Sequence, residues 1–291
     1  MKKDVWNIEL FLLLQITIFA VLIMSMRKLY LQILIVSFLA ISCKSEFQKA
    51  LKSNDYNLKY ETGIKFYNEK EYLKSQQLFE SVLPVYKGTD KDETINYYIA
   101  QCNYMNEDYA MASYYLKTFV NTFPNSDKAE ECRYLTGYCY YMSSPKYSLD
   151  QEYSRNAIEE FQVYINKYPH GVNVDLCNKY STELRKKIEK KAFLNSKTYY
   201  DMEKFKAANV ALKNYINGYP DSDYREETMY LIVKSGYLMA SNSITTKQFE
   251  RYESVVSDYE SYIDEYPTGK FVKDAEKYFT KSQEFIKKSS Q

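Results

Sequence analysis

The sequence predicts an all-α protein, built as a solenoid of about five helix pairs with a C-terminal capping helix. Three observations predict this fold. The chain of 291 residues contains 33 Tyr but only 7 Gly and 6 Pro, a composition that favours long helices over turns. A ladder of apolar residues recurs along the chain, and a small residue recurs upstream of each ladder. Repetition of one two-helix unit is typical of a solenoid, in which each unit packs on its neighbours.

The ladder precedes Pro124, Pro169, Pro220 and Pro267 at positions minus twelve, minus eight, minus five and minus one. Spacings of four, three and four residues place its members on one face of a helix, and the proline ends that helix. An earlier copy has Lys87-Gly88 in place of the proline. The five ladders are Ser75, Phe79, Val82 and Tyr86; Ala112, Leu116, Phe119 and Phe123; Ala157, Phe161, Tyr164 and Tyr168; Ala208, Leu212, Tyr215 and Tyr219; and Val255, Tyr259, Tyr262 and Tyr266.

A second helix is predicted upstream of each ladder, with a small residue that lets the two helices of a pair approach closely. These small residues are Gly63, Ala100, Gly137, Ser196 and Gly236. The predicted repeats span residues 57–89, 92–126, 129–171, 173–222 and 224–268, and the lysine-rich segment from Phe271 to Lys288 is the predicted capping helix.

Composition and motifs argue against nucleic-acid binding and against catalysis. The net charge is +1, with acidic and basic residues mixed throughout, so no basic surface for nucleic acid is indicated. The single histidine, His170, excludes histidine triads and multi-histidine metal sites, and no phosphate-binding or nucleophile motif is present. We therefore expect no enzyme activity, no cofactor, no metal and no small-molecule substrate.

The N-terminal region contains two apolar stretches, Leu10 to Met24 and Leu29 to Ser42. Read from Met26, the segment has a short basic region, an apolar region of about a dozen residues and small residues before Cys43, which is the layout of a secretory signal. This predicts that residues 1–25 are an upstream extension caused by a mis-assigned start, and that residues 26–42 are a signal peptide. The alternative is a membrane protein that spans the bilayer with Leu10 to Met24, in which Cys43 has no role.

The end of this segment, Leu39-Ala40-Ile41-Ser42-Cys43, resembles the lipobox of bacterial lipoproteins, although Leu39 lies one position farther upstream than is usual. The resemblance implies cleavage before Cys43, a lipid on its thiol, and a lipidated tether over residues 43–56 that leads to a repeat domain over residues 57–288. The other cysteines lie among apolar residues of helical segments, which favours buried free thiols, although export would permit a disulfide. They are Cys102, Cys132, Cys139 and Cys177.

Two rows of tyrosines recur every 37 residues in the first helices of the first three repeats. They form either the aromatic floor of a groove for an extended peptide or packing between repeats. Core packing is the more common role of such stripes. The six tyrosines are Tyr60, Tyr67, Tyr97, Tyr104, Tyr134 and Tyr141.

The small residue, the later aromatic residue, the alanine and the terminal proline of each unit resemble the tetratricopeptide repeat, although the period here is longer than the usual 34 residues. Together with the lipobox, the repeats resemble the BamD family of outer-membrane β-barrel assembly lipoproteins. That resemblance implies a non-enzymatic protein anchored by an N-terminal lipid to the periplasmic face of the cell outer membrane. Its C-terminal repeats would bind the periplasmic POTRA region of BamA, and its N-terminal repeats would receive unfolded outer-membrane proteins.

Two other functions remain open at this stage. The same architecture would suit a lipid-anchored scaffold for a peptidoglycan or division complex. It would also suit a polymer-binding lipoprotein of a nutrient-uptake system, although those chains are much longer.

Overall fold

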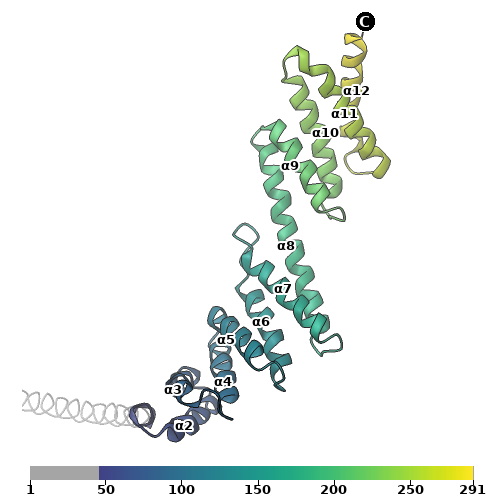
Figure 1. Cartoon of the computed structure of the whole chain (residues 1–291). Coiled ribbons are helices and arrows are strands. Elements are labelled where there is room, and N and C mark those ends of the chain that lie inside the picture. Colours follow the sequence, from purple (N-terminus) through teal and green to yellow (C-terminus); the bar gives the residue numbers. More distant parts are fainter. Residues whose placement is uncertain (1–45, 291) are drawn as a thin grey trace, which may run out of the picture. The chain divides into compact units, whose positions relative to one another are not determined.

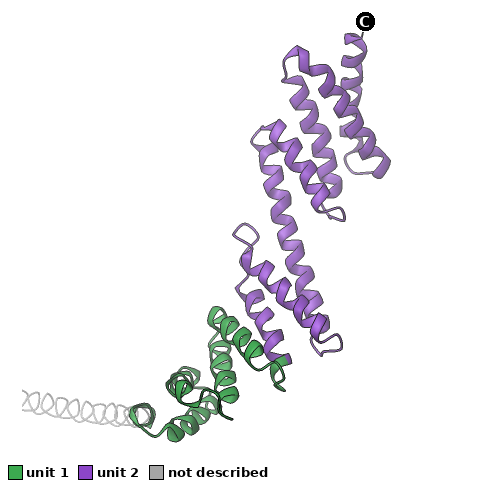
Figure 2. Cartoon of the chain, in the orientation of Figure 1, with its two compact units in different colours: residues 1–129 green, residues 130–291 purple. Residues whose placement is uncertain are grey.

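The computed structural model describes residues 46–290, which form helices joined by short turns, without a strand among them (Figure 1). The chain divides into two compact units, residues 1–129 and residues 130–291 (Figure 2). Unit 1 contains α2 (Tyr56–Asn68), α3 (Tyr72–Tyr86), α4 (Asp92–Met105) and α5 (Tyr109–Thr122). Unit 2 contains α6 (Ala129–Ser143), α7 (Glu152–Lys167), α8 (Val174–Asp201), α9 (Phe205–Gly218), α10 (Arg225–Ser241), α11 (Thr245–Glu265) and α12 (Val272–Ser289).

These helices form five successive pairs, from α2 and α3 to α10 and α11, and α12 packs on the last pair. The predicted fold class, a tetratricopeptide-type α-solenoid with a capping helix, is confirmed. We call the first helix of each pair the inner helix and the second the outer helix.

The predicted ladders form the buried face of the outer helices. In α7, Ala157, Phe161 and Tyr164 are fully buried, while the last ladder residue, Tyr168, is half-buried and caps the helix. The same arrangement recurs in α5, α9 and α11, where the residue before each proline is the C-cap. The spacing of four, three and four residues therefore identified the core face of each outer helix.

The small residues let the two helices of a pair come into close contact. A Cβ atom built on Gly63 would lie 3.1 Å from the Phe79 ring, and one on Gly137 would lie 2.7 Å from the Phe161 ring. Gaps of this size admit glycine but leave no room for a larger side chain without a shift of the ring. In the second repeat, Ala100 takes this position and is fully buried.

In the second to fifth repeats, a glutamate of the inner helix accepts a hydrogen bond at the turn after the outer helix. In the third repeat, the Tyr164 hydroxyl donates to Glu130 Oε1 over 2.8 Å. A Cβ atom on Gly171, two residues after the proline, would collide with that hydroxyl, so glycine is required where tyrosine and glutamate meet directly. The fifth repeat has the same set, Tyr262, Glu226 and Gly269.

A serine takes the place of that glycine in two repeats and joins the hydrogen bond. In the fourth repeat, Ser222 Oγ donates to Glu189 Oε1 over 2.6 Å and lies 2.6 Å from the Tyr215 hydroxyl. In the second repeat the ladder residue is Phe119, which has no hydroxyl, and Ser126 Oγ donates directly to Glu93 Oε1 over 2.7 Å. The turn and the glutamate of the inner helix are therefore joined in two ways. Where the turn has glycine, the tyrosine donates directly to the glutamate, and where it has serine, the serine donates instead.

Part of the segment predicted as a tether over residues 43–56 is folded. Residues 46–52 are helical, and Phe47 and Ala50 are buried against Phe66 and Leu78, with the two phenylalanine rings 5.9 Å apart. Because this segment packs on the first helix pair, residues 43–56 do not form an extended linker throughout. Cys43, the predicted signal peptide over residues 26–42 and the predicted extension over residues 1–25 lie outside the described residues. In the part of the chain that the structure describes, no helix combines the length and apolar character needed to cross a bilayer.

The 28-residue helix α8 is the main departure from regular repeats. At 1.5 Å per residue it is about 42 Å long, and it serves two separate packing clusters. Cys177 and Leu184, near its start, pack with the ladder of α7, whereas Phe193 packs with the ladder of α9. The outer helices α7 and α9 are therefore displaced from each other along α8 (Figure 1).

Candidate functional site

In unit 1, the four predicted tyrosines contact aromatic rings of neighbouring helices. Tyr60, only 9% exposed, packs edge-on against Phe79 at 6.0 Å and against Tyr86 at 6.1 Å. The half-buried Tyr67 lies 4.7 Å from Tyr98 of α4. The other two, Tyr97 and Tyr104, are half-buried and contact Phe119 and Tyr109 of α5.

In unit 2, the predicted pair belongs to a longer run of rings. Tyr134 lies 5.9 Å from Tyr138, which lies 6.0 Å from Tyr141, and Tyr141 lies 4.4 Å from Tyr180 of α8. The Tyr141 hydroxyl donates to Glu183 over 2.8 Å. Burial, reinforced by that hydrogen bond, raises the pKa of Tyr141 to about 12. This hydroxyl therefore stays protonated at neutral pH.

All six tyrosines thus take part in packing within or between repeats, and each keeps a partly exposed edge or lies close to the surface. The structure links Tyr67 to α4 through Tyr98, and Tyr134 to Tyr141 through Tyr138. Sequence reasoning missed Tyr98, Tyr138 and Tyr180. Tyr138 stands four residues after Tyr134 and three before Tyr141. This helical spacing could have predicted that the three rings lie on one face.

An open groove lies beside α9 and the last turns of α8, and the sequence did not predict it. The groove encloses about 660 Å³ and has an apolar floor that includes Phe205, Val210 and Ala211. Val210 is 56% exposed and Tyr199, at its edge, is 46% exposed. Its two charged lining residues are Lys204 and Lys206. We call this surface the α9 groove.

The length of α8 explains why the α9 groove is open. In the next repeat, Asp258 of α11 stands nine residues before the proline and pairs with Lys213 of the preceding outer helix, α9, over 2.8 Å. Its side chain is only 17% exposed. The residue at the matching position of α9 is Ala211, which lines the groove instead. Because α7 packs on the other end of α8, no preceding outer helix covers this face of α9.

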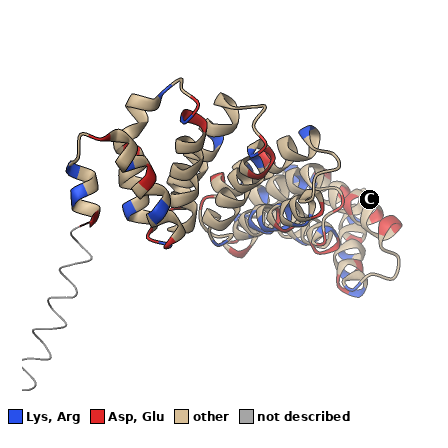
Figure 3. Cartoon of the chain, turned by 90° about the horizontal axis from the view of Figure 1, so that it is seen from below, with Lys and Arg blue, Asp and Glu red and all other residues tan. Residues whose placement is uncertain are grey.

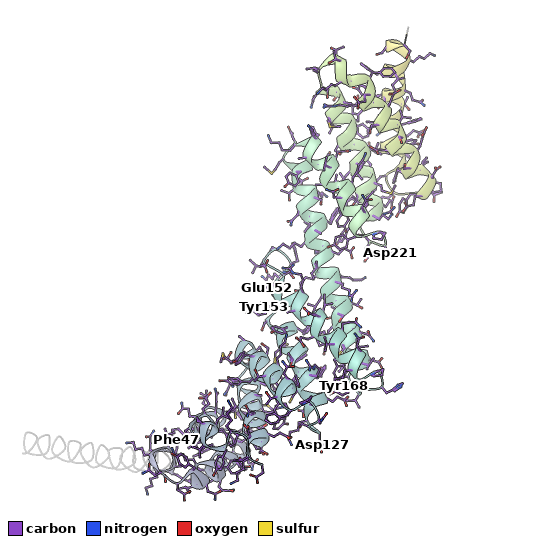
Figure 4. The ribbon with its side chains drawn as sticks, in the orientation of Figure 1. Phe47, Asp127, Glu152, Tyr153, Tyr168 and Asp221 are labelled. Atoms are coloured by element: carbon purple, nitrogen blue, oxygen red, sulfur yellow. The ribbon has the colours of Figure 1, made fainter. Side chains whose placement is uncertain are left out.

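The turns at the ends of α7 and α9 show the same displacement along α8. Tyr168, at the end of α7, and Asp221, in the turn after α9, mark turns at different levels along α8 (Figure 4). The α6–α7 connection contacts the middle of α8. Lys187 Nζ, from the middle of α8, donates to Ser144 Oγ over 2.6 Å and to the Pro145 carbonyl over 3.2 Å.

The four cysteines at positions 102, 132, 139 and 177 are buried and form no disulfide, as the sequence favoured. Burial raises the pKa of Cys102 to about 11 and those of Cys139 and Cys177 to about 12. Neutral buried thiols of this kind are poor nucleophiles and poor metal ligands. Within residues 46–290 no group of three or more His, Cys, Asp or Glu side chains is placed to hold a metal ion.

Charged residues of both signs are interspersed along the helices (Figure 3). The predicted turn residue His170 is exposed in the turn after α7. The α9 groove is thus an open surface with an apolar floor and a cationic edge, whereas the tyrosine rows lie in contacts between helices.

Comparison with known proteins gives a match to a family model and similarity to solved structures. No curated protein matches the chain. The chain is similar to the TPR2AB-domain:pHSP90 complex of yeast Sti1, with 15% identity and a TM-score of 0.35 over 78% of this chain and 98% of that chain. Residues 52–191 match the model of the family YfiO, described as outer membrane lipoprotein. Over its first three repeats and the start of the fourth, the chain is therefore similar to the YfiO outer membrane lipoproteins.

Proposed function

We propose that the protein is a non-enzymatic scaffold of the outer-membrane protein assembly complex, anchored by a lipid on Cys43 to the periplasmic face of the outer membrane. Its C-terminal repeats bind the periplasmic POTRA region of BamA, and its N-terminal repeats receive unfolded outer-membrane proteins. The similarity of residues 52–191 to outer membrane lipoproteins supports the anchored location. The α9 groove is the observation that carries the scaffold role.

The chemistry of the α9 groove suits a folded partner. Its exposed apolar floor supplies the desolvated centre of an interface, and Lys204 and Lys206 supply a cationic edge. Neither lysine has an ion-pair partner among the described residues. A partner surface with apolar side chains and carboxylates would therefore complete both parts of the groove.

Reversing the charge at the groove tests the BamA proposal. The double variant Lys204→Glu, Lys206→Glu of the full-length protein should recover at least about tenfold less BamA from solubilised membranes, since like charges across an interface oppose binding. The control is Lys179→Glu, Lys247→Glu, which changes the same charge at exposed positions outside the groove. Both variants should melt within a few degrees of the parent.

The outcome also distinguishes the proposed complex from other scaffolds. Unchanged recovery of BamA with the groove variant would remove the groove from this role. Recovery of peptidoglycan enzymes in place of a β-barrel protein would favour the cell-wall or division complex.

The substrate role is tested separately at the tyrosine rows. Tyr67→Ala with Tyr104→Ala should weaken crosslinking to a peptide from the C-terminal strand of an outer-membrane protein, because two aromatic surfaces of the inner helices are lost. The control is Tyr56→Ala with Tyr114→Ala, whose rings are 42% and 61% exposed. If crosslinking per folded molecule is unchanged, these tyrosines only pack repeats together.

A further inference from the structure

A second groove lies between α11 and α12. It encloses about 570 Å³, and its apolar lining is provided by Val256 and Ile286. Glu253 and Glu260 form its α11 edge. On the α12 edge Gln283 is accompanied by Lys287, so the lining carries a net negative charge.

This groove occupies the place where an outer helix would pack. In the preceding pair, Asn209 and Lys213 stand eleven and seven residues before Pro220, on the face of α9 next to α10 and α11. Val256 and Glu260 stand at the same two positions before Pro267. The face of α9 is covered, because Asn209 is only 9% exposed and Lys213 pairs with Asp258 of α11. No described residue covers the matching face of α11 in this way.

The contact between α9 and α11 indicates which charge a helix that packs on α11 needs. On α9, the residue seven positions before the proline is a lysine, and α11 answers it with an aspartate over 2.8 Å. On α11 the same position holds Glu260, so the sign is reversed. Neither Glu253 nor Glu260 makes a hydrogen bond or an ion pair within residues 46–290. An incoming helix therefore needs Lys or Arg at this edge.

The α12 side of the groove sets a steric condition. Ser282 and Ala275 are fully buried, 47 residues after the fully buried Ser235 and Thr228 of α10. By this register Gln283 stands where Gly236 stands in α10, the position at which inner and outer helices approach most closely. Because Gln is larger, a helix seated here must present a small residue opposite Gln283.

We propose that this groove binds an amphipathic helix of a partner protein, which takes the place of a sixth outer helix. Its apolar side chains contact Val256 and Ile286, its Lys or Arg residues pair with Glu253 and Glu260, and an Ala, Ser or Gly faces Gln283. This interaction is independent of the proposed BamA contact, which uses the cationic α9 groove.

A pair of synthetic peptides tests the charge requirement. The first is a fluorescein-labelled helix of about 15 residues, with Leu and Ala on one face and Lys on both flanks, and the second has Glu at every Lys position. By fluorescence anisotropy with the full-length protein, the Lys peptide should bind at least about tenfold more tightly than the Glu peptide. Equal binding of the two peptides would overturn the proposal.

Charge reversal in the protein locates the binding. The variant Glu253→Lys, Glu260→Lys should invert the preference between the peptides, while the variant Lys204→Glu, Lys206→Glu should leave it unchanged. Both glutamates are exposed, so the fold is expected to persist, and the melting curve checks this. A preference that survives the glutamate reversal would assign the binding to another surface and contradict the proposal.

Photo-crosslinking identifies the occupant in membranes. A benzophenone amino acid at position 256 should crosslink to a Lys- or Arg-containing helical segment of another protein, and the glutamate reversal should abolish that product. A probe at Val163, 37% exposed on α7, is the matched control and should not give it. Crosslinks at position 256 only to phospholipid, or only to a second copy of this chain, would show that the groove has a different occupant.

Discussion

At the scale of single residues, the contact between Tyr164, Glu130 and Gly171 gives a test of how the turns are built. The fourth and second repeats use serine at the position of Gly171, and the second repeat has Phe119 at the position of Tyr164. In the fourth repeat Ser222 stands between Tyr215 and Glu189, whereas Tyr164 donates directly to Glu130 over 2.8 Å. We expect Gly171→Ser alone to destabilise the protein by about 1–3 kcal/mol, because its Cβ overlaps the Tyr164 hydroxyl and the ring must move before the serine can join the contact. Urea unfolding measures this loss.

The second repeat also predicts which second substitution should restore the stability lost in Gly171→Ser. Adding Tyr164→Phe to Gly171→Ser recreates the combination of Phe119 and Ser126, in which the serine donates directly to the glutamate. The double variant should therefore be more stable than Gly171→Ser. A double variant less stable than either single variant would show that the two forms of this contact are not interchangeable.

Tyrosines that donate to carboxylates, namely Tyr164 and Tyr262 at the turns and Tyr230 of α10, which donates to Asp274, predict a loss of stability in alkali. Burial, together with hydrogen bonds to carboxylates, raises the pKa values of Tyr164, Tyr230 and Tyr262 to about 12. An unfolded tyrosine has a pKa of about 10, so the folded state holds the proton more tightly. The associated stability is fully present below pH 10 and is lost as the pH rises from about 10 to about 12.

Urea midpoints measured between pH 8 and pH 12, with tyrosinate absorbance recorded in parallel, check this expectation. Tyr164→Phe should reduce the steepness of the loss, because one raised pKa is removed. A urea midpoint independent of pH up to 12 would contradict the assignment of these hydroxyls to buried hydrogen bonds.

At the scale of elements, the connection between α6 and α7 depends on α8. The buried Gln151 side chain donates to the carbonyls of Lys146 and Leu149 over 2.9 and 3.0 Å. Lys187 and Lys191 of α8 donate to the same connection, and Lys190 Nζ lies 4.6 Å from the centre of the Tyr147 ring. Burial lowers the pKa of Lys187. The connection is thus held by one face of α8.

We expect Lys187→Met to loosen this connection, because the methionine keeps the apolar volume but leaves the Pro145 carbonyl without its donor. Trypsin cleavage after Lys146 should become about tenfold faster, with a change of only a few degrees in the melting temperature. The control is Lys186→Met, whose side chain is 64% exposed and pairs with Asp223. An unchanged cleavage rate would mean that Gln151, Lys190 and Lys191 hold the connection without Lys187.

The sequence predicted the outer helices well, because their ladders repeat a local spacing that ends at a proline. It also predicted the close contacts at Gly63 and Gly137, since a small residue in register indicates helix approach. It did not predict the α9 groove. That groove depends on how far α8 carries α9 away from α7, and this distance is set by packing of Leu184 and Phe193 on different partners.

The tyrosine rows show a second limit of sequence reasoning. A 37-residue period placed Tyr67 and Tyr104 at equivalent positions, and each contacts the first aromatic residue of its outer helix, Tyr72 or Tyr109. The period could not show that Tyr67 also contacts the next repeat through Tyr98. The period defines which residues are equivalent. The neighbours of each ring are decided by side chains from other helices.

At the scale of the whole molecule, the proposed anchor and the folded repeats are separable. Cys43→Ser should release a folded protein into the soluble fraction, because the lipid is lost while the packing of Phe47 on Phe66 remains. Fractionation with a circular dichroism spectrum of the released protein checks both parts. Membrane retention of Cys43→Ser would favour a spanning segment upstream of the cysteine.

The length of α8 also restricts how unit 2 can change. Successive residues of an α-helix are rotated by about 100°, so one residue inserted between Leu184 and Phe193 would rotate α9 to α12 by that angle relative to α6 and α7. Such an insertion would turn the α9 groove and the α11–α12 groove to a new direction together, without altering the lining of either. An insertion of about seven residues, close to two turns, would restore their direction and lengthen unit 2 by about 10 Å. In related chains, the length of α8 should therefore differ by whole helical turns. Such differences change the distance between the two parts of unit 2 but keep their relative rotation.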